Sequence, residues 1–133
     1  MPTRALVALA ATGALLATAA CAADTTSPAK DTVAIEVTSS DTACDVALTQ
    51  APAGAVDFTV TNTGSSATEF YLYAAGGKVV GEVEDIGPGL SRTLHVELAE
   101  PGTYETACKP GMTGDGIRAP FTVTDETATG TPT

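Results

Sequence analysis

Cysteines are the residues of this 133-residue chain whose chemistry could most readily define a function, and there are three of them. Cys44 and Cys108 each fall in a segment that alternates apolar and polar residues, and both occupy inward-facing positions of that alternation. Two inward cysteines can form a disulfide in an oxidising compartment, or they can offer paired thiolates to a metal ion. The sequence leaves both possibilities open. Cys21 lies apart, just after an apolar N-terminal segment.

A single histidine restricts the catalytic chemistry that the chain could support. His95 lies between Leu94 and Val96, in the outward register of its segment, where a solvated side chain is expected. The sequence therefore does not favour a Ser-His-Asp triad or a zinc site with several histidines. We expect the protein not to be an enzyme.

Short alternating segments indicate the elements that must position the two inward cysteines. The composition, with 13 glycines, 8 prolines and no tryptophan, favours β-structure with many turns. Period-two alternation recurs without any helical period at residues 33–38, 44–49, 56–60, 69–73, 78–84, 93–98, 104–108 and 119–124. This pattern predicts an all-β domain over residues 31–124, a Greek-key β-sandwich of about eight strands. Tyr104 is expected to form a tyrosine corner within it.

Residues 1–20 have the features of a removable export signal. Arg4 is followed by an apolar run that is too short for a comfortable membrane span, and two alanines then precede Cys21. Small residues before a cysteine resemble a bacterial lipobox, which implies that Cys21 is acylated and becomes the mature N-terminus. The alternative is an ordinary cleavage that leaves a free thiol. Residues 21–30 are then expected to form a tether, and residues 125–133 a disordered tail.

Charge and export together indicate where the domain works and which partners it avoids. The chain has 16 acidic and 6 basic residues, so its formal net charge is −10. Because such a surface repels phosphate backbones, we expect no nucleic-acid partner. An exported and acylated chain is expected outside the cytoplasm, held at the cell membrane by its lipid.

The segment from Pro101 to Pro120, PGTYETACKPGMTGDGIRAP, resembles the last ligand loop of cupredoxins. In that family a strand-ending cysteine, a Pro-Gly-His and a later Met bind copper, and a second His follows an earlier Asn-Gly loop. Here Met112 takes the place of the loop histidine. Glu69, which follows the loop of residues 62–68, takes the place of the second histidine. A blue-copper centre needs two imidazoles beside its thiolate, so electron transfer of that kind is not expected.

The chain also resembles the EfeO-type cupredoxin-like domain, the N-terminal module of the extracytoplasmic component of the EfeUOB iron-uptake system. The resemblance covers residues 31–124 and is carried by DTACDVALTQAPAG, FTVTNTGSSATEFYLYA, VVGEVEDIGPG and GTYETACKPGMTGDGIRAPFTV. It implies binding of iron or copper in support of an iron permease. The implied ligands are Cys44, Glu69 and Cys108, with Met112 as an addition. Longer members continue into a helical imelysin-like domain, and we expect a stand-alone lipoprotein without it.

The leading hypothesis is therefore an extracytoplasmic, membrane-anchored metal-binding protein associated with iron or copper handling. Soft donors at Cys108 and Met112 favour Cu(I), whereas Glu69 and other carboxylates favour harder ions such as Fe(III). The alternative is a disulfide-stabilised interaction module in which a Cys44–Cys108 bond occupies the old metal site. Such a module would dock on an iron permease or on an imelysin-domain partner.

Overall fold

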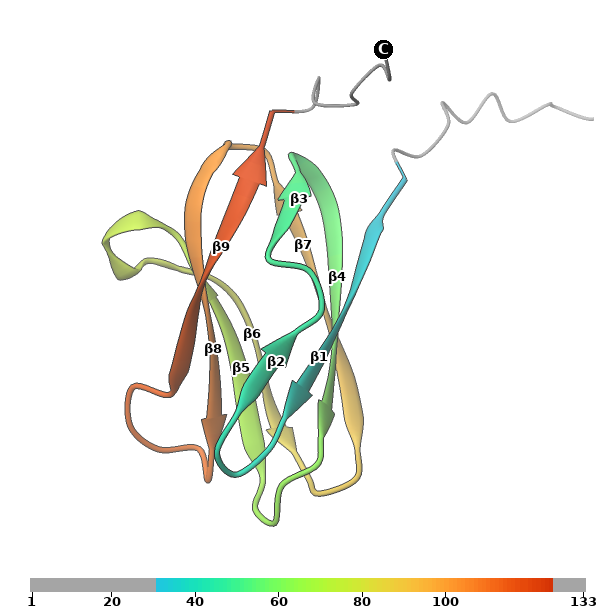
Figure 1. Ribbon diagram of the computed structural model, residues 1–133, viewed down its shortest axis with the longest axis vertical. Helices are drawn as coiled ribbons and strands as arrows, with labels where there is room; N and C mark the ends of the chain where they lie inside the picture. The colour runs from blue at the N-terminus through green and yellow to red at the C-terminus, as the bar shows by residue number, and fades with distance from the viewer. Residues whose placement is uncertain (1–30, 126–133) are drawn as a thin grey trace, which may run out of the picture.

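The computed structural model describes residues 31–125, which form two β-sheets packed face to face (Figure 1). The described chain contains nine strands and one short 3-10 turn, η1 (Ala75–Gly77). The strands are β1 (Val33–Ser39), β2 (Cys44–Val46), β3 (Gln50–Pro52), β4 (Gly54–Asn62), β5 (Thr68–Tyr73), β6 (Val79–Ile86), β7 (Ser91–Leu98), β8 (Gly102–Pro110) and β9 (Ile117–Thr124). The predicted all-β sandwich is confirmed. Within these residues no helix has the length and apolarity to cross a membrane.

The predictions for the two chain termini fall almost entirely on residues that the structure does not describe. The export signal of residues 1–20, the acylated Cys21 and the tether of residues 21–30 lie outside the described residues. Of the predicted tail, residues 125–133, all but Asp125 also lie outside the described residues. These predictions therefore remain expectations.

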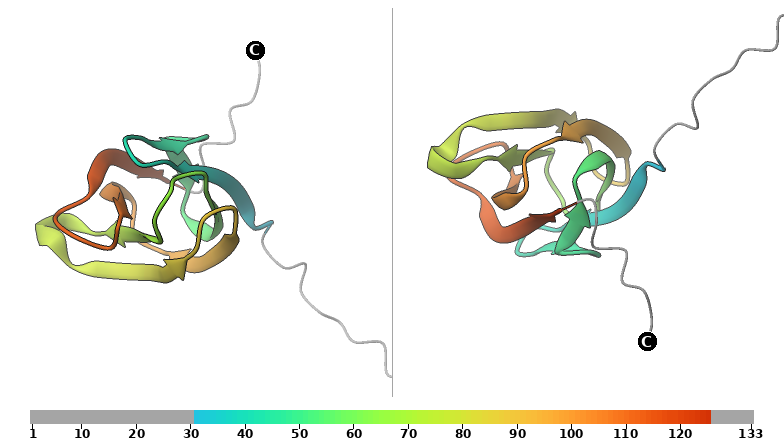
Figure 2. Two further views of the ribbon diagram at one scale, coloured as in Figure 1. Left: turned by 90° about the horizontal axis from the view of Figure 1, so that it is seen from below. Right: turned by 90° about the horizontal axis from the view of Figure 1, so that it is seen from above.

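Sheet topology brings four loops to one end of the sandwich. The four-stranded sheet has the order β2-β1-β4-β7, and the five-stranded sheet has the order β3-β9-β8-β5-β6. β1 pairs with β4 and β3 pairs with β9 in parallel, whereas the other paired strands are antiparallel. The two sheets enclose one core, as the end-on views show (Figure 2). At the lower end of Figure 1 lie the loops of residues 40–43, 63–67, 87–90 and 111–116, called the loop end below.

Period-two alternation buries one face of each long strand. Three aromatic rings fill the centre of the core, with the centroid of Phe58 5.4 Å from that of Phe70 and 5.4 Å from that of Phe121. Burying each such ring stabilises the fold by about 2–3 kcal/mol relative to leaving it exposed. Most of the inward positions predicted from the alternation are buried, among them Ile35, Val37, Val56, Phe58, Val60, Phe70, Leu72, Leu94, Val96, Leu98, Phe121 and Val123.

Residues 44–49 do not form one strand as the alternation predicted. β2 ends at Val46 in one sheet, and the chain then crosses to the other sheet, where β3 begins at Gln50. Leu48 lies in this crossing and is 47% exposed, although the pattern placed it on the same inward face as Cys44. Because a chain that changes sheets loses its alternation at the crossing, the structure has nine strands where about eight were expected.

Asn62, the last residue of β4, holds the loop end together through its buried side chain. It is 1% exposed, and its Nδ2 donates to the carbonyl oxygens of Ser66 at 2.8 Å and Ile86 at 2.7 Å. Its Oδ1 accepts from the backbone N–H of Gly64 at 2.8 Å. The backbone N–H of Asn62 also donates to the Leu90 carbonyl at 2.9 Å. One amide therefore joins the loop of residues 63–67 to the end of β6.

The predicted tyrosine corner is confirmed on β8. The hydroxyl of Tyr104 donates to the carbonyl oxygen of Glu100, four residues earlier in the chain, at 2.8 Å. This bond fixes the turn that leads from β7 into β8. β8 then carries Cys108 to the loop end.

Replacing Asn62→Ala should lower the free energy of unfolding by roughly 3 kcal/mol, because two carbonyl oxygens and one N–H lose their buried partner. Urea unfolding followed by circular dichroism measures this loss. Thr63→Ala is the control, since Thr63 is exposed and next in the chain, and it should change stability by less than about 0.5 kcal/mol. Equal stabilities for the two variants would contradict the role assigned to Asn62.

Candidate functional site

Cys44 and Cys108 are joined by a disulfide that links the two sheets. Their Cα atoms are 5.5 Å apart, at a sequence separation of 64. Cys44 begins β2, the edge strand of the four-stranded sheet, whereas Cys108 lies on β8 between β5 and β9. Of the two arrangements that the sequence left open for this pair, the structure contains the disulfide.

The two cysteines have different surroundings. Cys108 is 0% exposed, and its register partner on β5 is Phe70, whose side chain is also in the core. Cys44 is only half-buried, and it pairs with Ser39 of β1 close to the loop end. The bond therefore runs from the interior of one sheet to the open edge of the other.

Glu69 does not meet Cys108 in this structure. Across the β5–β8 ladder Glu69 is paired with Lys109, while Phe70 is paired with Cys108. Because adjacent residues of a strand point to opposite faces, Glu69 lies on the outer face of the sheet and Cys108 on the inner face. The sheet itself therefore separates two of the ligands that the resemblance implied.

Met112 lies in the loop that follows β8. Its backbone N–H donates to the carbonyl oxygen of Lys109 at 2.9 Å, and its φ of 55° is in the left-handed region. Its side chain is 40% exposed. Met112 is thus near the end of the strand that carries Cys108, on a turn and not in the core.

The residues present do not fit a blue-copper centre. Such a centre takes a free thiolate and two imidazoles, whereas the sulfur of Cys108 is already bonded to that of Cys44. His95, the one histidine in the sequence, lies on β7 in the other sheet, with its Nδ1 2.5 Å from Oδ1 of Asp57. Hydrogen bonding to that carboxylate raises the pKa of His95. Among residues 31–125 no three His, Cys, Asp or Glu side chains gather closely enough to hold a metal ion.

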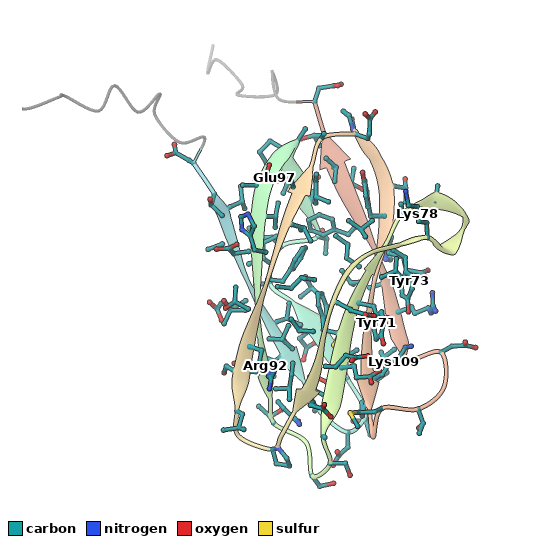
Figure 3. The ribbon with its side chains drawn as sticks, turned by 180° about the vertical axis from the view of Figure 1, so that it is seen from behind. Tyr71, Tyr73, Lys78, Arg92, Glu97 and Lys109 are labelled. Carbon is teal, nitrogen blue, oxygen red and sulfur yellow. A yellow bond between two sulfur atoms is a disulfide. The ribbon has the colours of Figure 1, made fainter. Side chains whose placement is uncertain are left out.

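A second cluster, which sequence analysis missed, covers the outer face of the five-stranded sheet. Tyr71 and Tyr73 stack with ring centroids 5.6 Å apart and planes 6° from parallel. Lys109 Nζ lies 4.0 Å from the centroid of the Tyr71 ring, and Arg118 Cζ lies 4.5 Å from that of Tyr73. These four residues are called the tyrosine face below, and Figure 3 shows three of them along one side of the sandwich. The alternation of residues 69–73 puts Tyr71 and Tyr73 on one face, and this was the sequence signal for the stacked pair. It did not show that Lys109 and Arg118 lie over the two rings.

Two carboxylates hold side chains of the tyrosine face in place. The hydroxyl of Tyr71 donates to Oε1 of Glu84 at 3.1 Å, and Arg118 forms an ion pair with Glu105. Burial, together with this hydrogen bond, raises the pKa of Tyr71 well above its usual value, so the phenol stays protonated. Tyr73 is only 7% exposed although it points outward. The cluster is therefore an ordered surface and not a set of loose side chains.

Comparison with protein families finds one matching family model. The profile of the cupredoxin-like domain matches residues 6–123, which is most of the chain. The chain belongs to the cupredoxin-like domain family. No curated protein matches its sequence significantly.

Solved structures similar to this cupredoxin-like protein include two auracyanins. Na-dithionite-reduced auracyanin from Roseiflexus castenholzii superposes with a TM-score of 0.58 and 21% identity, over 72% of this chain and 98% of that one. Auracyanin A, a "blue" copper protein from Chloroflexus aurantiacus, gives a TM-score of 0.48 and 13% identity, over 71% and 100% of the two chains. At such identities the likeness to the Roseiflexus protein shows a shared fold. The predicted iron or copper ion remains a prediction.

Proposed function

We propose that this cupredoxin-like protein is a disulfide-closed interaction module outside the cytoplasm and that it holds no resident copper. The Cys44–Cys108 bond carries the proposal, because it uses the sulfur that the scaffold would otherwise give to a metal. The remaining implied oxygen ligand, Glu69, is on the far side of the sheet. The module has no catalytic role of its own.

The partner we propose is an imelysin-domain protein of an iron-transport system. Support comes from the resemblance to EfeO-type domains, whose longer members carry an imelysin-like domain in the same chain. An export signal and an acylated Cys21 would place this module on the outer side of the membrane, where such a partner works. A membrane anchor would also raise the local concentration of the module beside an iron permease.

The tyrosine face supplies a surface with the composition of a protein interface. Tyrosine and arginine are enriched among the residues that dominate binding energy. Four basic residues fall within residues 31–125, namely Lys78, Arg92, Lys109 and Arg118, and two of them belong to this face. Since its rings are stacked and its cations are held over them, the face would lose little side-chain freedom on binding.

Docking through this face can be tested with the full chain co-produced with the imelysin-domain protein of the same genome. Tyr71→Ala combined with Lys109→Ala should reduce co-purification of that protein several-fold, because the aromatic contact and its cation are both removed. The control pair is Arg92→Ala with Thr93→Ala on β7, at the far edge of the other sheet. Equal co-purification for the tyrosine-face variant and the wild type, or co-purification with the permease alone, would contradict the proposal.

Metal binding by the reduced protein is the second candidate function. The specific observation is that the two cysteine sulfurs already share one site, with Met112 on the turn that follows Cys108. Reduction would leave two thiolates at one site and the thioether of Met112 four residues after Cys108, a soft set that suits Cu(I) better than Fe(III). In this form Glu69 would contribute nothing, since it lies on the other face of the sheet.

Anaerobic metal titration of the oxidised and reduced protein separates the two candidates. The oxidised protein should retain neither copper nor iron after desalting, and it should show no intense blue colour with Cu(II), because no thiolate or imidazole pair is available. The reduced protein should gain Cu(I) affinity by at least about tenfold, and Met112→Leu should lower that gain whereas Glu69→Gln should not. One tightly held copper or iron per oxidised chain would overturn the interaction-module proposal.

A further inference from the structure

The two sulfurs of the disulfide differ in how a reagent could reach them. Cys108 is fully buried in the core, between β5 and β9. Cys44 is half-buried at the start of a three-residue edge strand that pairs only with β1. Thiol–disulfide exchange requires a thiolate to reach one sulfur directly. In the folded protein, Cys44 is therefore the more exposed residue of the pair.

A groove leads to Cys44 at the open edge between the sheets. It has a volume of about 380 Å³ and is bordered by β1 and β2 on one side and by Ala119 of β9 on the other. Cys44 is part of its lining and Cys108 is not. The groove therefore gives access to one end of the bond only.

Two carboxylates give this groove a negative charge. Glu36 on β1 and Asp45 on β2 both line it, and its lining contains no lysine, arginine or histidine. A negatively charged thiol entering the groove is repelled, whereas a neutral or cationic one is not. The chain as a whole, at a net charge of −10, strengthens the same preference.

We propose that the Cys44–Cys108 disulfide is an exchange site, at which a protein dithiol with a neutral or basic surface attacks Sγ of Cys44. The first partner thiolate forms a bond to Cys44 Sγ, and Cys108 leaves as a thiolate. The second partner thiol then attacks the partner's own bonded sulfur and releases Cys44. The partner dithiol is oxidised to a disulfide by two electrons, and its two protons pass to Cys44 and Cys108.

Exchange at this position would free the edge strand from β8. The disulfide is the bond between β2 and β8, so its reduction leaves β2 held by its ladder with β1, by packing and by the chain that continues into β3. The same step would expose the soft sulfur pair on which the second candidate function depends. The inference rests on the disulfide of the proposed function. A disulfide that is present but does not exchange would contradict the exchange proposal and leave the proposed function unaffected.

Two small thiols of opposite charge, cysteamine and 3-mercaptopropionate, test the site on the oxidised full chain under native conditions. Reactions are quenched with acid, alkylated and mapped by peptide mass spectrometry. The exchange rate of each thiol is divided by its thiolate fraction and by its rate with hydroxyethyl disulfide, an uncharged reference disulfide. The first adduct should form on Cys44, and the corrected rate for cysteamine should exceed that for mercaptopropionate by roughly three- to tenfold.

Matched charge variants assign the preference to the groove. Glu36→Gln with Asp45→Asn should bring the ratio of the two rates close to one. Glu82→Gln with Glu97→Gln removes the same charge on β6 and β7, at the opposite edge of the sandwich, and should leave the ratio unchanged. A first adduct on Cys108, exchange only in denaturant, or the same ratio in both double variants would overturn the proposal.

Discussion

A covalent bond between an edge strand and a central strand is the constraint on which the rest of the arrangement depends. β2 is three residues long, and the chain leaves it at once to enter the other sheet at β3. The Cys44–Cys108 disulfide holds this crossing against β8. With a sequence separation of 64, loss of chain entropy in the unfolded state gives such a link about 4 kcal/mol of stabilisation.

The alternation of β5 and β8 divides the chemistry of the domain between two faces. Inward positions carry the core and the sulfur of Cys108, while outward positions carry Glu69, Lys109 and the stacked tyrosines. A ligand set that combines the cysteine with the glutamate would have to span the sheet. In this cupredoxin-like fold the sulfur of Cys108 therefore forms a bond between the sheets, while the carboxylate of Glu69 lies on the outer face.

Local patterns predicted most of the fold and only part of the site. Alternation placed Phe58 and Phe121 in the core and both cysteines inward, and the spacing of Tyr104 identified the corner. Alternation did not predict that the chain passes from one sheet to the other at Leu48. Such a crossing depends on which sheet edges the rest of the fold leaves unpaired. Nor did alternation predict that the Lys109 ammonium lies over the Tyr71 ring. The register between β5 and β8 depends on how the two strands pair, and the sequence of one strand does not fix it.

The pairing state of Cys44 and Cys108 in the cell is the most direct test of this account. Cells that make the full chain are quenched in acid and alkylated, and their membranes are digested without reductant for mass spectrometry. A single cross-linked species that contains the Cys44 and Cys108 peptides is expected, in protein that carries no stoichiometric metal. Two separately alkylated peptides, from protein that carries one copper or iron per chain, would contradict it.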